Sequence, residues 1–402
     1  MASFRSCPRA WDFGSRVRQN HVPVVPARVF DFDKAMHVGL AAYYLPAMDD
    51  WSRSIVRPLA VQGFRRAMGE HRTAYEEAAP LSPEQESEWE QYLRLGEVVL
   101  NRYFDWAGPN DDFDSVLSDE DLWVPVPDLD NPGRELGTHD ERPIRVFLRL
   151  DQLISDANDE YWVVDHRIVW DDWDDDETLV ADEHALRAQW AVEVAYPQLV
   201  VAGTIYNQLR IRGRDLEAAA EAAARPGSAA EGTPDQRDMT RGSRHVNVRR
   251  SPLSTMPKEQ EVSLPGYAEA VTESGPRPDD IDLLWSRAGN DHVRRTFIRR
   301  CRTSVRRIGR QMAQDATDVR GPHVDVSPRP SPDKCPSCAF LKPCTMLDQR
   351  LDIAPVMSAE YRKRSEEEFE EEGLRWSPSR RAQRGSLGGT EDQTKNARFR
   401  WG

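Results

Sequence analysis

Two aspartates, Asp151 and Asp165, lie in a sequence pattern that favours a pair of metal-binding carboxylates. Each belongs to a β-like run, one over residues 143–154 and the other over 160–170, and only a short polar turn separates the runs. Side chains on a strand alternate between its two faces, so adjacent antiparallel runs bring defined residues together in cross-strand pairs. The two runs therefore predict a β-hairpin.

The register of this hairpin decides whether the two carboxylates meet. A turn of three to five residues centred on Asn158 pairs Ser155 with Tyr161. The same register places Asp151 opposite Asp165, with Cβ atoms about 4.5–5.5 Å apart. Two carboxylates this close repel each other unless a cation lies between them, and a divalent metal with oxygen ligands removes that conflict. The alternative is a register that differs by one residue, with one aspartate facing solvent.

Cysteines form a second group with ligand chemistry. Cys335, Cys338 and Cys344 follow a C-x2-C-x5-C spacing, and Cys7 can supply a fourth thiolate. Four thiolates suit either an iron–sulfur cluster or a tetrahedral zinc ion, and the spacing does not decide between the two. Unligated cysteines are the remaining alternative, and Cys301 is left over in any case.

Composition limits the class of protein. The chain has 402 residues, of which 39% are hydrophobic and 30% charged, as in a globular protein with more than one structural unit. No run approaches the roughly 18 apolar residues of a membrane helix, and the N-terminus lacks the apolar stretch of a secretory signal. We therefore expect a cytoplasmic protein.

Charge is unevenly placed along the chain. The net charge of −14 argues against a surface that binds polyanions everywhere, but residues 293–310 carry eight arginines and no acid. Five arginines fall near a spacing of three to four residues: Arg294, Arg295, Arg299, Arg302 and Arg306. On a helix they can follow a DNA backbone, and a solvated face is the alternative.

The elements that must position these residues follow from periodicity. Helices are predicted as two within 33–72, one opened by the N-cap Ser82, one over about 181–195 and one over 291–317. A further strand is predicted over 198–211, whereas 108–142 reads as a long surface loop and the acidic stretch 171–176 as a solvated loop.

Short motifs occur along residues 6–348 in a consistent order. They are SCPRAW (6–11), KAMHVGLAAYY (34–44), LRLD (148–151), WVVDHR (162–167), DEHALRAQW (182–190) and CPSCAFLKPC (335–344). Together they resemble the motifs of RecB-like nucleases of the PD-(D/E)XK superfamily. That family includes CRISPR-associated and phage exonucleases with a C-terminal cysteine triad.

The resemblance implies an α/β, restriction-endonuclease-like fold, in which helices flank a mixed sheet. It implies a [4Fe–4S] cluster that joins the N- and C-terminal segments through Cys7, Cys335, Cys338 and Cys344. It also implies Mg²⁺ or Mn²⁺ on His37, Asp151, Asp165 and the backbone carbonyl of His166. The implied activity is hydrolysis of DNA, as single strands or from ends, in phage or microbial recombination and repair, with recombination proteins as partners.

The expected organisation follows from these segments. In chain order it comprises an N-terminal cluster segment (1–30), a helical region (31–140), the nuclease core (141–212), a flexible insertion (213–245), a helical and cysteine-cluster region (246–348) and a largely disordered tail (349–402).

Several positions depart from the family pattern. Arg167 replaces the family lysine on the same strand face as Asp165; it can hold a phosphate bidentately but cannot lose a proton. His184 replaces a glutamine, Ala188 a tyrosine and Lys34 a glycine, which makes Lys34 and His184 accessory candidates. The sequence thus supports a metal-dependent exonuclease whose catalytic residues are Asp151, Asp165 and Arg167. The alternatives are a catalytically weakened or silent relative that binds DNA or a protein, and a zinc-stabilised scaffold.

Overall fold

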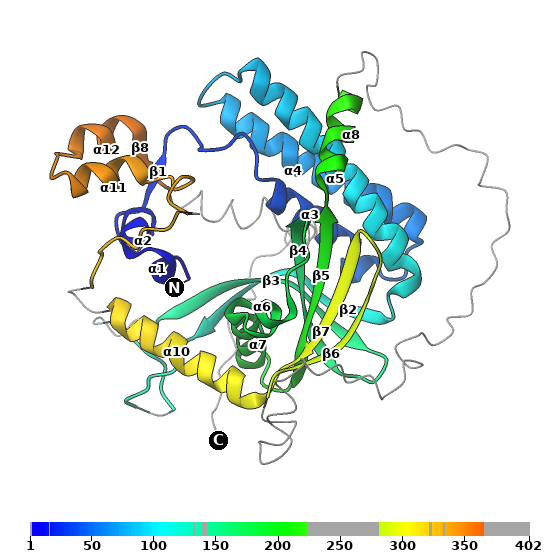
Figure 1. Cartoon of the computed structure of the whole chain (residues 1–402). Coiled ribbons are helices and arrows are strands. Elements are labelled where there is room, and N and C mark those ends of the chain that lie inside the picture. The colour runs from blue at the N-terminus through cyan, green and yellow to red at the C-terminus, as the bar shows by residue number, and fades with distance from the viewer. Residues whose placement is uncertain are drawn as a thin grey trace, which may run out of the picture.

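A six-stranded mixed sheet lies at the centre of the protein (Figure 1). The computed structural model describes residues 2–15, 17–131, 133–138, 143–223, 281–320, 324–332 and 334–365. In spatial order the strands are β2 (Phe113–Pro125), β3 (Arg145–Asp156), β4 (Tyr161–Trp170), β5 (Val201–Ile211), β7 (Val293–Arg299) and β6 (Leu283–Gly289). Only β4 and β5 are parallel. A parallel pair needs a crossover, which α6 (Asp176–Val180) and α7 (Glu183–Ala195) provide.

One group of helices packs on the sheet from the side that α3 occupies (Figure 1). It consists of α3 (Phe32–Tyr43), the short 3-10 helix η1 (Pro46–Met48), α4 (Arg53–Glu76), α5 (Pro83–Asn110) and α8 (Gly213–Ala223). The predicted cap of α5 is confirmed: Ser82 accepts from Gln85 N and the Gln85 side chain accepts from Ser82 N. Apolar residues of α3, α4 and α5 form one buried cluster, which fixes α3 against the sheet.

A second apolar cluster joins α7 and α10 (Arg302–Arg320) to β2, β3 and β4. Gly309 permits the close contact between the two helices, because a Cβ there would lie 2.4 Å from Nε1 of Trp190. The sheet is therefore covered by helices on both faces, and the mixed α/β architecture expected from the sequence is confirmed at this level.

The two ends of the described chain pack together (Figure 1). The N-terminal elements are α1 (Ala2–Ser6), α2 (Pro8–Gly14) and β1 (His21–Pro23); the C-terminal elements are α11 (Leu341–Asp348), α12 (Ala354–Glu360) and β8 (Tyr361–Lys363). Strands β1 and β8 pair antiparallel, and the rings of Phe13 and Phe340 stack with centroids 5.3 Å apart. Among the described helices, none is long and apolar enough to span a membrane.

Four expectations about elements differ from the structure within the described residues. Residues 108–142, expected to form a loop, contain the 13-residue strand β2; its buried acids hid the alternating pattern. The expected helix over 291–317 begins only at Arg302, and the arginines before it lie on the buried strand β7. The expected insertion 213–245 begins with helix α8, and its remainder lies outside the described residues. Likewise, the expected disordered tail begins with α12 and β8, and residues beyond 365 lie outside the described part.

Candidate functional site

The hairpin of β3 and β4 has the predicted register. Ser155 pairs with Tyr161, and pairing continues to Gln152 and Val164, after which the ladder ends. The next position in the same register is that of Asp151 and Asp165. The backbone N–H of His166 donates to Oδ2 of Asp151 at 2.9 Å. The two carboxylates therefore lie where the paired strands begin to separate.

His37 reaches this point from helix α3. Asp31 caps the helix by accepting from the backbone N–H of Lys34, and His37 follows one turn further on. Nδ1 of His37 lies 3.2 Å from Oδ1 of Asp151, and its Nε2 lies 3.8 Å from Oδ2 of Asp33. The structure thus brings the predicted imidazole onto the predicted carboxylate.

The ionisable groups of the site perturb one another strongly. Burial disfavours a charged His37, but Asp151 and then Asp33 raise the pKa of His37 to about 10. Burial opposes ionisation of Asp151, yet His37 holds the pKa of Asp151 well below its usual range. Burial, followed by the charge of Asp151, raises the pKa of Asp165 to about 6. The charge of Asp151 therefore opposes ionisation of Asp165, while His37 and Arg167 favour the ionised carboxylates.

A third carboxylate, Asp119 on β2, lies beside the pair and was missed in the sequence. It falls between the paired positions Ser118–Gln152 and Glu120–Leu150, opposite Asp151, with a positive φ of 50°. Burial raises the pKa of Asp119 to about 7; Arg149 lowers this pKa and Asp151 raises it. The sequence did contain a signal for this strand, an acidic run within an alternating pattern of apolar residues. The interpretation of residues 108–142 as a loop hid that signal.

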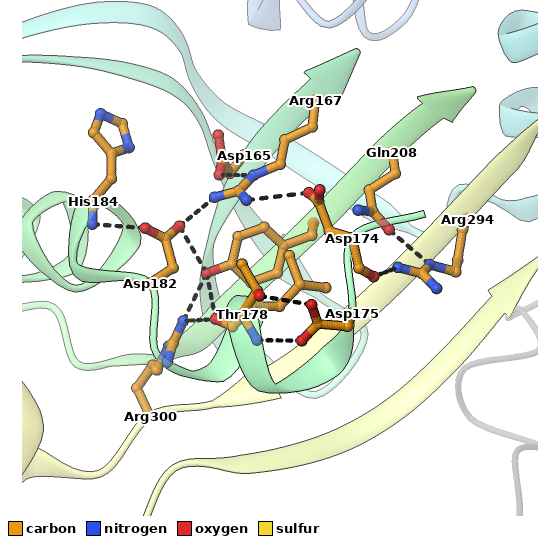
Figure 2. A network of polar contacts seen from close by, with 12 residues as sticks. Asp165, Arg167, Asp174, Asp175, Thr178, Asp182, His184, Gln208, Arg294 and Arg300 are labelled. Atoms are coloured by element: carbon orange, nitrogen blue, oxygen red, sulfur yellow. Dashed lines mark hydrogen bonds and ion pairs between the residues drawn. The ribbon is translucent and has the colours of Figure 1, made fainter. Parts of the chain in front are cut away.

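Arg167 is held by three carboxylates (Figure 2). Its Nε donates to Asp165 Oδ2 at 2.9 Å, and its terminal nitrogens contact Asp174 at 3.3 Å and Asp182 at closer range. Its guanidinium carbon lies 4.6 Å from the centre of the Tyr206 ring. Burial opposes the charge, but Asp165 and Asp182 raise the pKa of Arg167 far above its usual value. Arg167 is thus a permanent, positionally fixed cation.

In the acidic stretch 171–176, Asp174 lies beside Arg167 (Figure 2). Asp171, Asp172 and Asp175 are exposed, as expected for a solvated loop. Asp174 pairs with Arg167, and its backbone carbonyl accepts from Arg294. Asp175 caps α6 by accepting from Thr178 N at 2.7 Å. Asp174 therefore forms an ion pair with Arg167, and Asp175 caps a helix.

The accessory candidates contribute little in this structure. Lys34 is exposed and lies 3.7 Å from Oδ2 of Asp31, its ion-pair partner. His184 is exposed; its backbone N–H donates to Asp182 at 2.8 Å, while its ring points away from that carboxylate (Figure 2). The charge of His184 still lowers the pKa of Asp165. Ala188 is buried in the core on α7.

The five arginines proposed to follow DNA do not form one row. Arg295 is only 2% exposed, so it cannot contact DNA in the folded protein. Arg294 contacts Gln208 at 2.7 Å, and Arg299 pairs with Glu160 at 2.6 Å. Arg302 and Arg306 are exposed on α10. The helical-row interpretation failed because the first three arginines belong to a strand.

The four predicted cluster cysteines lie near one another. Cys7 immediately precedes α2, Cys335 and Cys338 lie in the turn before α11, and Cys344 lies within α11. Burial raises the pKa of the Cys338 thiol, and the charges of Cys7, Cys344 and Cys335 raise it further. The fifth, Cys301, is buried elsewhere, with Sγ 3.3 Å from the Ser304 hydroxyl.

Neither group is arranged as a closed metal cage. Within the ranges that the structure describes, no three or more His, Cys, Asp or Glu side chains are placed so that they could hold a metal ion. At the carboxylate pair, His37 contacts Asp151 and Arg167 contacts Asp165. To bind a metal ion, the two aspartates would therefore have to give up these contacts or share their oxygens between them and the ion.

Comparisons of the chain with protein-family models, with curated proteins and with solved structures find no match. The resemblance to RecB-like nucleases therefore rests on the motifs, and the function on the geometry of the site.

Proposed function

We propose that the protein is a metal-dependent DNA exonuclease of the RecB-like type, with His37, Asp151 and Asp165 at its centre. The observation that carries this proposal is the 3.2 Å contact between His37 Nδ1 and Asp151 Oδ1, next to Asp165 on the adjoining strand. An imidazole from a helix and two carboxylates from a hairpin converge in the order that the motifs imply.

The donor chemistry fits Mg²⁺ or Mn²⁺. Carboxylate oxygens from Asp151 and Asp165 and the His166 carbonyl are ligands that these ions accept. A His37 nitrogen would join them on loss of the ring proton, because a metal ligand must be deprotonated. The raised pKa of Asp165 reflects burial beside another carboxylate, a conflict that a divalent cation relieves. When bound, such an ion supplies positive charge to phosphate oxygens and acidity to a water molecule.

The protein's own residues would perform the orienting steps. The His166 N–H holds one oxygen of Asp151 while His37 faces the other, which fixes the carboxylate plane. Arg167 orients Asp165 through Nε. A guanidinium cannot accept a proton, so Arg167 does not act as the general base; we assign it to positioning Asp165 and neutralising charge.

An aromatic pair supports single-stranded DNA as the substrate. Trp123 on β2 and Phe147 on β3 are cross-strand partners, 55% and 47% exposed, with ring centroids 4.8 Å apart. Two residues further along β3, Arg149 pairs with Asp121, and two further still lies Asp151. Exposed aromatic rings stack on the bases of single strands irrespective of sequence. The pair therefore lies about 13 Å along the strand from the proposed site.

The cysteine group supports a [4Fe–4S] cluster that joins the two ends of the chain. The thiols come from an N-terminal and a C-terminal segment that already pack through β1–β8 and through Phe13 and Phe340. Four thiolates in a partly buried site suit this cluster, and zinc is the alternative with the same ligands.

A second candidate function is a weakened relative that binds DNA or a protein partner without efficient cleavage. The engagement of Arg167 by Asp165, Asp174 and Asp182 favours it, because this cation is fixed away from a substrate phosphate. The two candidates share the fold and differ in rate.

The deciding experiment measures Mn²⁺-dependent release of nucleotides from end-labelled single-stranded DNA. Wild type is compared with Asp165→Ala and with Asp105→Ala, an exposed aspartate on α5 that pairs with Arg57. We expect the Asp165 variant to lose activity and the Asp105 variant to retain it. Wild-type activity no greater than that of Asp165→Ala rejects the exonuclease.

A further inference from the structure

Arg295 is a buried cation on β7, the strand between β5 and the edge strand β6. Its side chain lies on β7, with a guanidinium nitrogen 2.8 Å from Oδ1 of Asp111 and its guanidinium carbon 4.8 Å from the centre of the Trp106 ring. Burying a charge costs free energy unless the charge is paired and hydrogen-bonded, and an apolar side chain would often replace such a pair without loss of stability. The contacts of this buried charge therefore matter more than its contribution to packing.

The contacts of Arg295 fix the orientation of an amide. Nε of Arg295 donates to Oδ1 of Asn207 at 2.6 Å. The amide nitrogen of Asn207 must then face the other way, where it lies 3.1 Å from the Tyr103 hydroxyl and 3.4 Å from Nδ1 of His166. An amide nitrogen only donates hydrogen bonds, so Nδ1 of His166 accepts, and the ring proton resides on Nε2.

The His166 imidazole packs against two tyrosine rings, and the backbone of His166 contacts the site. Tyr44 stacks on the His166 ring at 5.7 Å with an interplanar angle of 14°, and Tyr103 meets the ring edge-on at 6.3 Å. The backbone N–H of His166 donates to Oδ2 of Asp151. A continuous buried chain of contacts thus runs from Arg295 through Asn207 and His166 to Asp151.

We infer that Arg295 and Asn207 are positioning residues, which hold the His166 ring with Nδ1 as a hydrogen-bond acceptor and thereby fix the residue whose backbone N–H holds Asp151. Their action on His166 is independent of any metal, whereas the consequence for cation binding at Asp151 rests on the proposed function. Arg295 thus acts from within the folded core. This role replaces the contact with DNA that its place in the arginine-rich segment suggested.

The first test observes the imidazole nitrogens of His166 by ¹⁵N NMR in the full chain. Asn207→Asp presents only acceptors to the ring and is expected to move the proton to Nδ1. Arg295→Met frees the amide to flip, so a mixture of tautomers is expected, and Arg295→Lys, which still donates, is expected to restore part of the Nε2 form. Arg299→Met, which removes a cation on the same strand paired with Glu160, is the matched control and should leave His166 unchanged.

The second test measures Mn²⁺ affinity from the electron paramagnetic resonance signal of free Mn²⁺. Loss of a group that orients a metal ligand typically weakens metal binding roughly ten- to hundredfold, which is the drop expected for Asn207→Asp and Arg295→Met but not for Arg299→Met. A wild-type Nε2 spectrum in folded Asn207→Asp overturns the inference, even if Arg295→Met fails to fold. Unchanged Mn²⁺ affinity alongside a shifted tautomer overturns the link to Asp151. Wild type that binds no Mn²⁺ rejects the proposed function, and the tautomer result still decides the role of Arg295 and Asn207.

Discussion

Arg167 Nε lies 2.9 Å from Asp165 Oδ2, two positions earlier on the same strand. The RecB-like motif that residues 162–167 resemble has a lysine where this chain has Arg167, and an ammonium is a compact charge on a flexible stem. A guanidinium presents a planar fork that can bind several carboxylates at once. Here the fork contacts β4, the acidic stretch and the N-cap of α7, so this one side chain connects three elements at the edge of the site.

Arg167→Lys is expected to separate the two candidate functions. Lysine cannot contact Asp165, Asp174 and Asp182 together, so we expect a loss of about 1–3 kcal/mol in the free energy of unfolding from weakened charge-assisted hydrogen bonds. We also expect Mn²⁺-dependent nuclease activity to rise at least about tenfold if the native site is weakened.

Nuclease rate and urea denaturation are measured on the same preparation. Arg187→Lys, which alters the ion pair of Arg187 with Glu183 on α7, is the control and should change neither strongly. Robust wild-type activity with no gain from lysine eliminates the weakened relative and leaves the active exonuclease.

Trp123→Ala and Phe147→Ala are expected to weaken binding of single-stranded DNA. Base stacking on an aromatic ring contributes about 1–3 kcal/mol, which corresponds to a rise in KM of roughly 5- to 150-fold. Because both rings are exposed, the free energy of unfolding should change by less than about 0.5 kcal/mol.

The measurement is KM and kcat on single strands of defined length. Trp51→Ala removes a comparably exposed tryptophan, which precedes α4, and provides the control. Equal KM values for wild type and both β2–β3 variants would show that this aromatic pair does not bind the substrate strand.

The hairpin was predictable because its information is local. A short polar turn and a strict alternation of side chains set the pairing of Ser155 with Tyr161, and no distant residue is needed to choose that register. His37 was found through the motif KAMHVGLAAYY (34–44), which the structure places on α3 behind the N-cap Asp31. Local pattern thus located the centre of the site.

The residues that surround this centre could not be predicted, because their positions depend on pairing between residues that are far apart in the sequence. Asp119 and Asp121 make β2 look like a loop, and Arg149 on the neighbouring strand pairs with both of them in their buried positions. Arg295 looked like a surface residue because its partners, Asp111 and Asn207, are distant in sequence. A charge that is buried against a remote partner reads in sequence as an exposed one.

Cys338→Ser is expected to abolish the cofactor, whereas Cys301→Ser is expected to leave it intact. Cys338 lies among the other three predicted ligands, and Cys301 is buried near Ser304. Iron, acid-labile sulfide, zinc and visible absorbance are measured per chain after anaerobic purification. Iron and sulfide lost only in Cys338→Ser support the cluster; stoichiometric zinc without iron replaces it with a structural zinc site.

The same variant also tests whether the cofactor joins the chain ends. Limited proteolysis should release the segment around α11 and α12 faster in Cys338→Ser than in wild type, because only non-covalent contacts would then join the described ends, among them the three-residue β1–β8 pairing, the Phe13–Phe340 cluster and the Arg9–Asp348 ion pair. Cleavage at equal rates in both proteins would mean that these contacts hold the ends without a cofactor.

His71 on α4 is expected to make stability depend on pH. Its Nδ1 accepts from the backbone N–H of Asp31 at 3.2 Å, and burial lowers the pKa of His71 from 6.5 to about 4. The folded state therefore favours the neutral ring. The stabilisation is fully present above pH 6.5 and is lost as the pH falls towards 4, since the unfolded chain binds the proton more readily.

The size of this effect is at most about 3 kcal/mol, from a shift of 2.5 pKa units. His71→Asn retains an acceptor for the Asp31 N–H but has no proton to bind. Urea unfolding at pH 7 and at pH 4.5 should therefore show a larger loss of stability for wild type than for His71→Asn, while carboxylates elsewhere titrate equally in both. Equal losses would mean that His71 is protonated in the folded protein as readily as in the unfolded chain, and that the Asp31 contact does not hold the ring neutral.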